Sequence, residues 1–261
     1  MEYSGFERIG DVLIRQAPNV VEATIDRPRV FNALNDGVVT GLEGALDIAE
    51  ANDSTVLVLR GAGSNFCSGG DLEYASTLFD DLERGLFAFI GRLRSVCDRL
   101  ADGPFVSLAL VEGYALAGGY EILTACDMAL ATTTASIGDR HMEYALAPGL
   151  GASVRVARHL TSKQARYLVF TGETITGEQA ARWGLVSHAW RTEDFEHQAD
   201  LLINRLASRN RTAMQLYKRM MLSGERDGFA EALQNEERMF REYQSHHQDA
   251  REGVERFRAR P

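Results

Sequence analysis

The chain has 261 residues, with 28 Lys and Arg against 37 Asp and Glu, a formal net charge of −9 at pH 7, and 45% hydrophobic residues. This length and composition are ordinary for a globular protein with one large core. The negative charge argues against non-specific nucleic-acid binding and against an anionic membrane surface, because both need a cationic face. Only Lys163 and Lys218 are lysines, so the binding of any anion would fall to arginines.

The chain shows no targeting or metal-binding pattern. No run reaches the roughly 18 apolar residues of a membrane helix, and the first residues lack the charged and apolar regions of a signal peptide. We therefore expect a cytoplasmic protein. Cys67, Cys97 and Cys126 are widely spaced and form no CxxC pair. This spacing predicts reduced thiols, with neither a disulfide framework nor a zinc site.

Short runs rich in β-branched residues predict strands in the first two thirds of the chain. Residues 12–14 and 20–25 flank a Pro18-Asn19 turn signal, which is typical of a hairpin. Further strands are predicted at residues 56–59, 105–111, 128–131 and 186–190. Each is a nearly continuous apolar run, as expected for strands that are covered on both faces.

Helical patterns lie between and after these strands. Residues 79–100 carry one apolar stripe that we expect to face the core; its members are Leu82, Leu86, Phe89, Leu93, Val96 and Leu100. From about residue 162 the chain is predicted to be mainly helical, with N-cap signals at Thr161 and Thr176 and stop signals at Gly172 and Gly184. The sequence thus predicts an α/β half followed by a helical half, with no linker between them.

Glycines are concentrated in two segments that each follow a predicted strand, residues 61–71 and 113–121. Glycines between a strand and a helix leave backbone N–H groups open to an anion or to a developing oxyanion. Two such loops on adjacent strands could direct two N–H groups at one oxygen. Paired glycines also make simple tight turns, and the spacing alone leaves both interpretations open.

Glu121 favours the catalytic interpretation of the second segment. It lies three residues after Gly118, in the first turn of a predicted helix, and apolar residues follow it. No partner for its carboxylate is evident in the local sequence. A largely buried carboxylate of this kind is a candidate general base.

Five motifs in order carry a resemblance to a known family. They are residues 25–35 (IDRPRVFNALN), residues 66–72 (FCSGGDL), residues 117–127 (AGGYEILTACD), residues 171–186 and the C-terminal residues 252–261. Together they are similar to the signatures of the enoyl-CoA hydratase/isomerase, or crotonase, superfamily, and the match runs nearly from end to end. The chain is identified as a member of that superfamily on this basis.

The resemblance implies an α/β fold with a crotonase-like core of repeated strand-strand-helix turns over residues 1–195, and a C-terminal helical trimerisation region over residues 196–261. It implies homotrimers that commonly pair into hexamers. It also implies an acyl-CoA thioester substrate whose carbonyl oxygen is bound by two backbone N–H groups, those of Gly70 and Gly118. Coenzyme A would be part of the substrate, with no permanently bound cofactor and no metal.

The resemblance also suggests which residues contact the coenzyme. Arg29 and Arg260 stand where the family often has lysines that face the phosphates, and Arg can form forked bonds to phosphate. The other expected contacts lie in the turn after Arg29 and in the first glycine loop: Asn32, Ala33, Ser68, Gly69, Asp71 and Leu72. For Asp71 a loop-capping or surface role is the competing interpretation.

The sequence departs from the family pattern at the second catalytic carboxylate. That residue is expected seven positions before Pro148, and the residue there is His141. The proline that usually precedes it is replaced by Arg140. Glu143 is a second carboxylate nearby, but on a helix it would point about 200° away from His141.

Four interpretations of this departure remain open. In the first interpretation, His141 acts as an acid or base beside Glu121, because imidazole titrates near neutrality, and hydratase activity is retained. Glu121 alone would instead suit a double-bond isomerase. A histidine here is also similar to the family's β-diketone hydrolase, which cleaves a C–C bond, although that enzyme has an aspartate where this chain has Leu150. In the fourth interpretation the chain binds acyl-CoA without catalysis.

Overall fold

The computed structural model describes residues 1–258. Its strands are β1 (Glu7–Ile9), β2 (Val12–Ala17), β3 (Val20–Ile25), β4 (Val56–Gly61), β5 (Val106–Val111), β6 (Tyr114–Leu116), β7 (Met128–Thr132), β8 (Ser136–Gly138), β9 (Ile175–Thr176) and β10 (His188–Trp190). Its α-helices are α1 (Asp36–Ala51), α2 (Leu72–Ser76), α3 (Ala88–Asp102), α4 (Gly118–Ala125), α5 (Ala152–His159), α6 (Ser162–Thr171), α7 (Gly177–Trp183), α8 (Thr192–Ala207), α9 (Arg211–Arg226), α10 (Phe229–His246) and α11 (Asp249–Arg258). Shorter helical segments are η1 (Pro28–Val30), η2 (Leu82–Phe87) and η3 (His141–Tyr144).

A seven-stranded sheet forms the centre of the molecule, in the order β1-β2-β3-β4-β5-β7-β10. The first three strands are antiparallel, and those from β3 to β10 pair in parallel. The predicted hairpin is confirmed as β2 and β3, and Asn19 in its turn has a positive φ of 65°. A second, three-stranded sheet in the order β6-β8-β9 lies nearer the candidate site.

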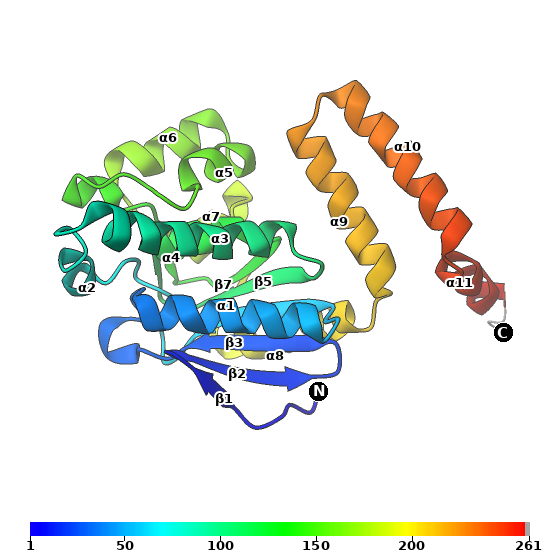
Figure 1. Cartoon of the computed structure of the whole chain (residues 1–261), viewed down its shortest axis with the longest axis horizontal. Coiled ribbons are helices and arrows are strands. Elements are labelled where there is room, and N and C mark those ends of the chain that lie inside the picture. The colour runs from blue at the N-terminus through cyan, green and yellow to red at the C-terminus, as the bar shows by residue number, and fades with distance from the viewer. Residues whose placement is uncertain (259–261) are drawn as a thin grey trace.

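Helices cover both faces of the central sheet, as the continuous apolar strands predict. Residues of β4 alternate between two buried clusters: Leu57 and Leu59 belong to the cluster that contains α1 and α3, and Val56 and Val58 to the cluster that contains α8. Figure 1 shows α1 and α3 on one side of the strands and α8 on the other. This double coverage leaves the loops at the carboxyl ends of the parallel strands as the place where ligands can bind.

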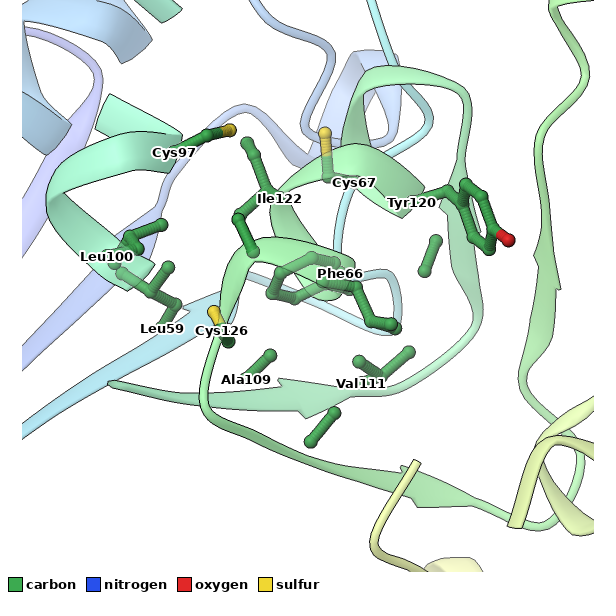
Figure 2. Packing of buried hydrophobic residues seen from close by; sticks show 14 of the residues in the cluster. Leu59, Phe66, Cys67, Cys97, Leu100, Ala109, Val111, Tyr120, Ile122 and Cys126 are labelled. Carbon is green, nitrogen blue, oxygen red and sulfur yellow. The ribbon is translucent and has the colours of Figure 1, made fainter. Parts of the chain in front are cut away.

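The larger cluster packs the two glycine loops against α4. Phe66 from the first loop and Tyr120 and Ile122 from α4 are fully buried in it, beside all three cysteines (Figure 2). The cysteines are free and buried, and burial raises the pKa of the Cys67 and Cys97 thiols to about 12. The three side chains therefore act as small apolar residues of the core.

The apolar stripe predicted over residues 79–100 is confirmed only in its second half. Phe89, Leu93, Val96 and Leu100 are buried on α3, whereas Leu82 is 45% exposed. Residues 82–87 form a π-helix, η2, instead of the first turns of one continuous α-helix. The wider π turn breaks the 3.6-residue period, so the face that carries Leu82 no longer lines up with the face of α3 that meets the core.

The predicted helix boundaries after residue 160 are confirmed. Thr161 caps α6 in a capping box with Gln164, and Thr176 caps α7 by accepting a hydrogen bond from the Gln179 amide. Gly172 and Gly184 end these helices in the left-handed conformation. Side-chain oxygens satisfy N–H groups at the start of each helix, and glycine tolerates the positive φ at its end.

Helices α9 to α11 extend away from the rest of the molecule as an arm (Figure 1). Helix α8 does not belong to this arm, because Phe195, Ala199 and Ile203 pack against the sheet. The predicted boundary at residues 195–196 falls inside α8, and the division into a core and an oligomerisation region stays a prediction. The buried Lys218 fastens α9 to the body: its Nζ donates to Asp127 Oδ2 at 2.7 Å and to the carbonyl of Phe105 at 2.8 Å.

Candidate active site

The two glycine loops lie against each other, as predicted from adjacent parallel strands. β4 and β5 pair directly, and isolated bridges join Cys67 to Ala115 and Leu34 to Gly70. A Cβ built on Gly119 would clash with the carbonyl of Cys67, and one built on Gly118 would lie 2.8 Å from Leu34 Cδ1. Glycine is needed at Gly119 because the second loop packs directly on the backbone of the first, and at Gly118 because the Leu34 side chain approaches it closely.

The amides of Gly70 and Gly118 are close together and available. The Leu34 N–H donates to the Gly69 carbonyl, and the Leu34 carbonyl accepts from the Asp71 N–H. Gly70 lies between these two bonds, so its own N–H points to the opposite side of the strand. Gly118 is the first residue of α4, where an N–H has no acceptor inside the helix. A Cβ on Gly118 would lie 3.7 Å from the Gly70 nitrogen. Both donors can therefore serve one oxygen, with the α4 dipole in support.

Ala117 sets the direction of the Gly118 amide. Its φ of 45° and ψ of −116° lie in a region that residues with a side chain rarely adopt. Such strain persists where the surroundings determine it, and it is concentrated at functional sites. Sequence reasoning missed this feature, because an alanine gives no signal for a positive φ.

Glu121 is almost fully buried beneath these amides. Its Oε1 accepts hydrogen bonds from the amides of Leu150 at 2.8 Å and Ala152 at 3.3 Å, and its side chain is 2% exposed. Burial raises the pKa of Glu121, while the charge of His141 and the two amides oppose the increase. The expectation of a largely buried carboxylate is confirmed, but it has partners, and they come from a loop 29 to 31 residues later.

His141 lies next to Glu121. Its Nε2 is 3.5 Å from Glu121 Oε2, and its Nδ1 is 2.9 Å from Oδ1 of the buried Asp139. Burial lowers the pKa of His141, but the hydrogen bond and charge of Asp139 and the charge of Glu121 outweigh it, so the pKa is raised. Glu143 pairs with Arg140 at the surface and does not join this group. The structure thus brings Glu121 and His141 together, and it places Gly118, which lies beside Gly70, at the start of the helix that carries Glu121.

Two other predicted residues, one outside the first loop and one at its end, hold this loop in place. The buried Asn32 accepts from the Arg27 amide and donates to the carbonyls of Ala62 and Asn65, so its side chain joins two segments of the protein. Asp71 caps α2 and pairs with Arg27 at 2.9 Å. Burial raises the pKa of Asp71, but hydrogen bonds from Tyr74 and Arg27 lower it further, so it is below its ordinary value. The capping role considered for Asp71 is confirmed.

The remaining predicted contacts differ in their exposure. Arg29 is exposed on η1 and makes no ion pair within residues 1–258. Ala33 is buried and its carbonyl accepts from Arg27, Gly69 is buried with a φ of 105°, Ser68 is partly buried, and Leu72 is 48% exposed. Arg260 lies outside the described residues.

Sequence reasoning missed three contributors to the site. Asp139 is buried behind His141, and Arg27 joins Asp71 to Ala33. The amides of Leu150 and Ala152 hold Glu121. The short spacing between Asp139 and His141 was a usable signal, whereas the backbone donors could not be recognised from residue types. The described residues contain no cluster of His, Cys, Asp and Glu arranged to hold a metal ion.

Comparison with known proteins decides the family. The sequence profile of the enoyl-CoA hydratase/isomerase family matches residues 15–260. The chain belongs to this family. It is 30% identical over 240 residues to a Mycobacterium leprae protein named as a probable enoyl-CoA hydratase, which covers 90% of this chain and 86% of that protein. It is 29% identical over 237 residues to the short-chain-enoyl-CoA hydratase of Clostridium acetobutylicum, covering 90% and 89%.

Solved structures of the family share the fold. The enoyl-CoA hydratase of Bacillus anthracis superposes with a TM-score of 0.88 at 28% identity, covering 95% of this chain and 96% of that one. The predicted crotonase fold of this family member is therefore confirmed. Within the described part of the chain, no helix has both the length and the apolarity needed to cross a membrane.

Proposed function

We propose that this family member is an enoyl-CoA hydratase that uses Glu121 and His141 as its acid/base pair. The observation that carries the proposal is the 3.5 Å separation of these two side chains, with Glu121 on the helix whose first residue, Gly118, lies beside Gly70. The amides would bind the thioester carbonyl oxygen and stabilise the enolate that forms on it. The relatives named as enoyl-CoA hydratases support this choice.

The geometry suits stepwise addition of water across the C2–C3 double bond. The Glu121 carboxylate accepts a proton from water as the water oxygen bonds to C3, and the electron pair of the double bond moves onto the thioester as an enolate. The His141 imidazolium then donates its Nε2 proton to C2, and the carbonyl re-forms. A proton can pass from Glu121 to His141 across their 3.5 Å separation, which restores the starting state.

Arg29 would bind the phosphates of coenzyme A. It is exposed beside the first loop and has no ion pair within residues 1–258, while the whole chain carries a net charge of −9. A Thermobifida fusca protein with this fold, at 21% identity, was crystallised with acetoacetyl-CoA. Arg29→Glu should raise KM with little change in kcat, whereas Arg205→Glu, an exposed arginine on α8, should leave both unchanged. Equal effects of both variants would contradict this role.

The C-terminal arm would form contacts between copies of the chain. It exposes large apolar side chains, among them Tyr217 (68% exposed), Met221 (66%), Phe229 (82%) and Phe240 (54%). Exposed apolar patches of this kind usually bind another protein surface, and closed symmetric homo-oligomers are the commonest result. We expect a homotrimer or a pair of trimers. Light scattering after gel filtration tests it, and a monomer at micromolar concentration would refute it.

The activity is tested with crotonyl-CoA and longer 2-enoyl-CoA thioesters. Hydration removes the conjugated double bond, so the ultraviolet absorbance of the enoyl thioester should fall with the wild type and persist with Glu121→Ala. A 3-enoyl-CoA that gains this absorbance would instead identify an isomerase. Tight acyl-CoA binding without turnover of any thioester would identify a non-catalytic binder.

A second candidate function is hydrolysis of a C–C bond in a β-diketo substrate. The contact between Asp139 and His141 favours it, because a carboxylate-bound imidazole can activate water. The hydrolase has an aspartate at the position of Leu150 in this chain. Here Asp139 supplies a carboxylate to His141 instead. Release of a carboxylic acid from a β-diketo compound, without hydration of enoyl-CoA, would favour this candidate over the hydratase.

A further inference from the structure

Asp139 is a buried carboxylate whose charged partner is a histidine. Its side chain is 1% exposed, and none of the Lys and Arg side chains that the structure describes forms an ion pair with it. Its Oδ1 lies 2.9 Å from His141 Nδ1 and also accepts the His141 backbone N–H at 3.2 Å. A buried carboxylate is costly unless it is paired, so the structure commits Asp139 to His141.

The backbone around Asp139 builds this contact. Asp139 follows the last residue of β8, Gly138, where a Cβ would lie 2.7 Å from the carbonyl of Glu173. The next residue, Arg140, has a φ of 58°, and this left-handed residue turns the chain so that Asp139 can bond to both the backbone and the ring of His141. A proline could not adopt this φ, because its ring fixes φ near −65°.

We propose that Asp139 is the positioning residue of the site, which fixes the ring of His141 in the tautomer protonated at Nδ1 and so directs Nε2 at Glu121 and the substrate. The effect of Asp139 on catalysis rests on the proposed hydratase function, whereas its effect on the His141 tautomer is independent of that function. A carboxylate accepts hydrogen bonds only, so the neutral ring places its proton on Nδ1 and its lone pair on Nε2. When Nε2 is protonated, that N–H is the proton that moves to C2.

The surrounding charges agree with this assignment. The charged groups that face His141 are Asp139 from the β8 side and Glu121 from α4, and both favour the imidazolium. Burial, and after it the charge of Asp139, raises the pKa of Tyr120, a residue of α4. Among the described residues, neither Asp139 Oδ2 nor the Tyr120 hydroxyl has a hydrogen-bond partner, and the contacts to His141 are made by Oδ1.

The tautomer is tested by nitrogen-15 NMR of the histidine rings, with the His141 signals assigned from His141→Gln. In the wild type we expect neutral His141 to be protonated at Nδ1. In Asp139→Asn the pKa of His141 should be lower, and the neutral ring should no longer prefer protonation at Nδ1, because an amide does not carry the charge of the carboxylate. Glu143→Gln is the matched control: it removes an exposed carboxylate two residues after His141 and should change neither property.

Kinetics measure the consequence. Asp139→Asn should lower kcat by about 10²-fold with little change in KM, and should move the alkaline limb of the pH profile to lower pH. Wild-type His141 protonated at Nε2 in its neutral form would overturn the proposal, and this measurement needs no variant that might fail to fold. Unchanged tautomer and kinetics in Asp139→Asn would overturn it as well. If the wild type hydrates no enoyl thioester, the hydratase proposal fails while the NMR result still decides the role of Asp139.

Discussion

Replacing Glu121 by Gln or by Ala should separate its two roles. Glu121 is the proposed base, and its Oε1 also accepts the Leu150 amide at 2.8 Å and the Ala152 amide at 3.3 Å. Gln keeps an oxygen for these amides and removes the base, whereas Ala removes both. Loss of a positioned base lowers kcat/KM by about 10²- to 10⁴-fold, which corresponds to about 3–5 kcal/mol of transition-state stabilisation.

The two variants should differ in stability. A buried N–H without an acceptor costs about 1–3 kcal/mol, so Glu121→Ala should lower the free energy of unfolding by at least that amount relative to Glu121→Gln. Burial raises the pKa of Glu121 in the folded protein, so the folded state favours the protonated form. The ionised carboxylate therefore destabilises the fold above this raised pKa, and the penalty is relieved as the pH falls through it. Glu121→Gln has no such penalty and should be more stable than the wild type at neutral pH.

Urea unfolding at several pH values, combined with the enoyl-CoA assay, tests this reasoning. The expected pattern is an inactive but stabilised Gln variant and an inactive, destabilised Ala variant. The stability gain of the Gln variant should shrink as the pH decreases. Two results would refute it: a Gln variant that retains more than about one tenth of the activity, or equal stability of the Gln and Ala variants.

Three further predictions follow from other contacts. Lys218→Met removes the buried ammonium that donates to Asp127, a carboxylate whose side chain is 22% exposed, and should lower the free energy of unfolding by about 1–3 kcal/mol, whereas Lys163→Met, at an exposed lysine, should leave the thermal midpoint unchanged. His141→Ala should lower kcat by about 10²-fold or more and abolish the alkaline limb of the pH profile; an unchanged rate would exclude the two-residue mechanism. Ala117→Val should destabilise the protein and reduce kcat by displacing the Gly118 amide, while Ala117→Gly should fold normally, and equal melting temperatures would contradict the strain at a φ of 45°.

Much of the fold could be predicted because its signals are local. The β2–β3 hairpin follows from a turn signal between two β-branched runs, and the limits of α6 follow from Thr161 and Gly172. Strands β6, β8 and β9 were not predicted, since two or three residues are too few to show a period. The π-helix at residues 82–87 was missed for a related reason: its apolar residues fit an α-helical stripe equally well.

The residues of the candidate site likewise divide into those with a local sequence signal and those without one. The two glycine loops and Glu121 were found because glycines next to strands and a carboxylate in an apolar run stand out in a sequence, and the family resemblance then singled out Gly70 and Gly118 within the loops. Asp139 was missed because its pairing with His141 depends on the left-handed turn at Arg140, which residue type does not predict for an arginine. The partners of Glu121 are backbone amides, which every non-proline residue has, so only the folded chain shows which of them are used.

The site separates the binding of the thioester from the transfer of protons. The proposed oxyanion donors are backbone groups, placed by the packing of one glycine loop on the other, and their position does not depend on residue 141. In the proposed mechanism, proton transfer depends on Glu121 from α4 and on His141 from η3, the turn after β8. A change at residue 141 can therefore alter which proton moves while the enolate remains stabilised. Histidine at this position needs a partner to fix its ring, and Asp139 provides it within the same turn, so the two residues are best understood as one functional unit.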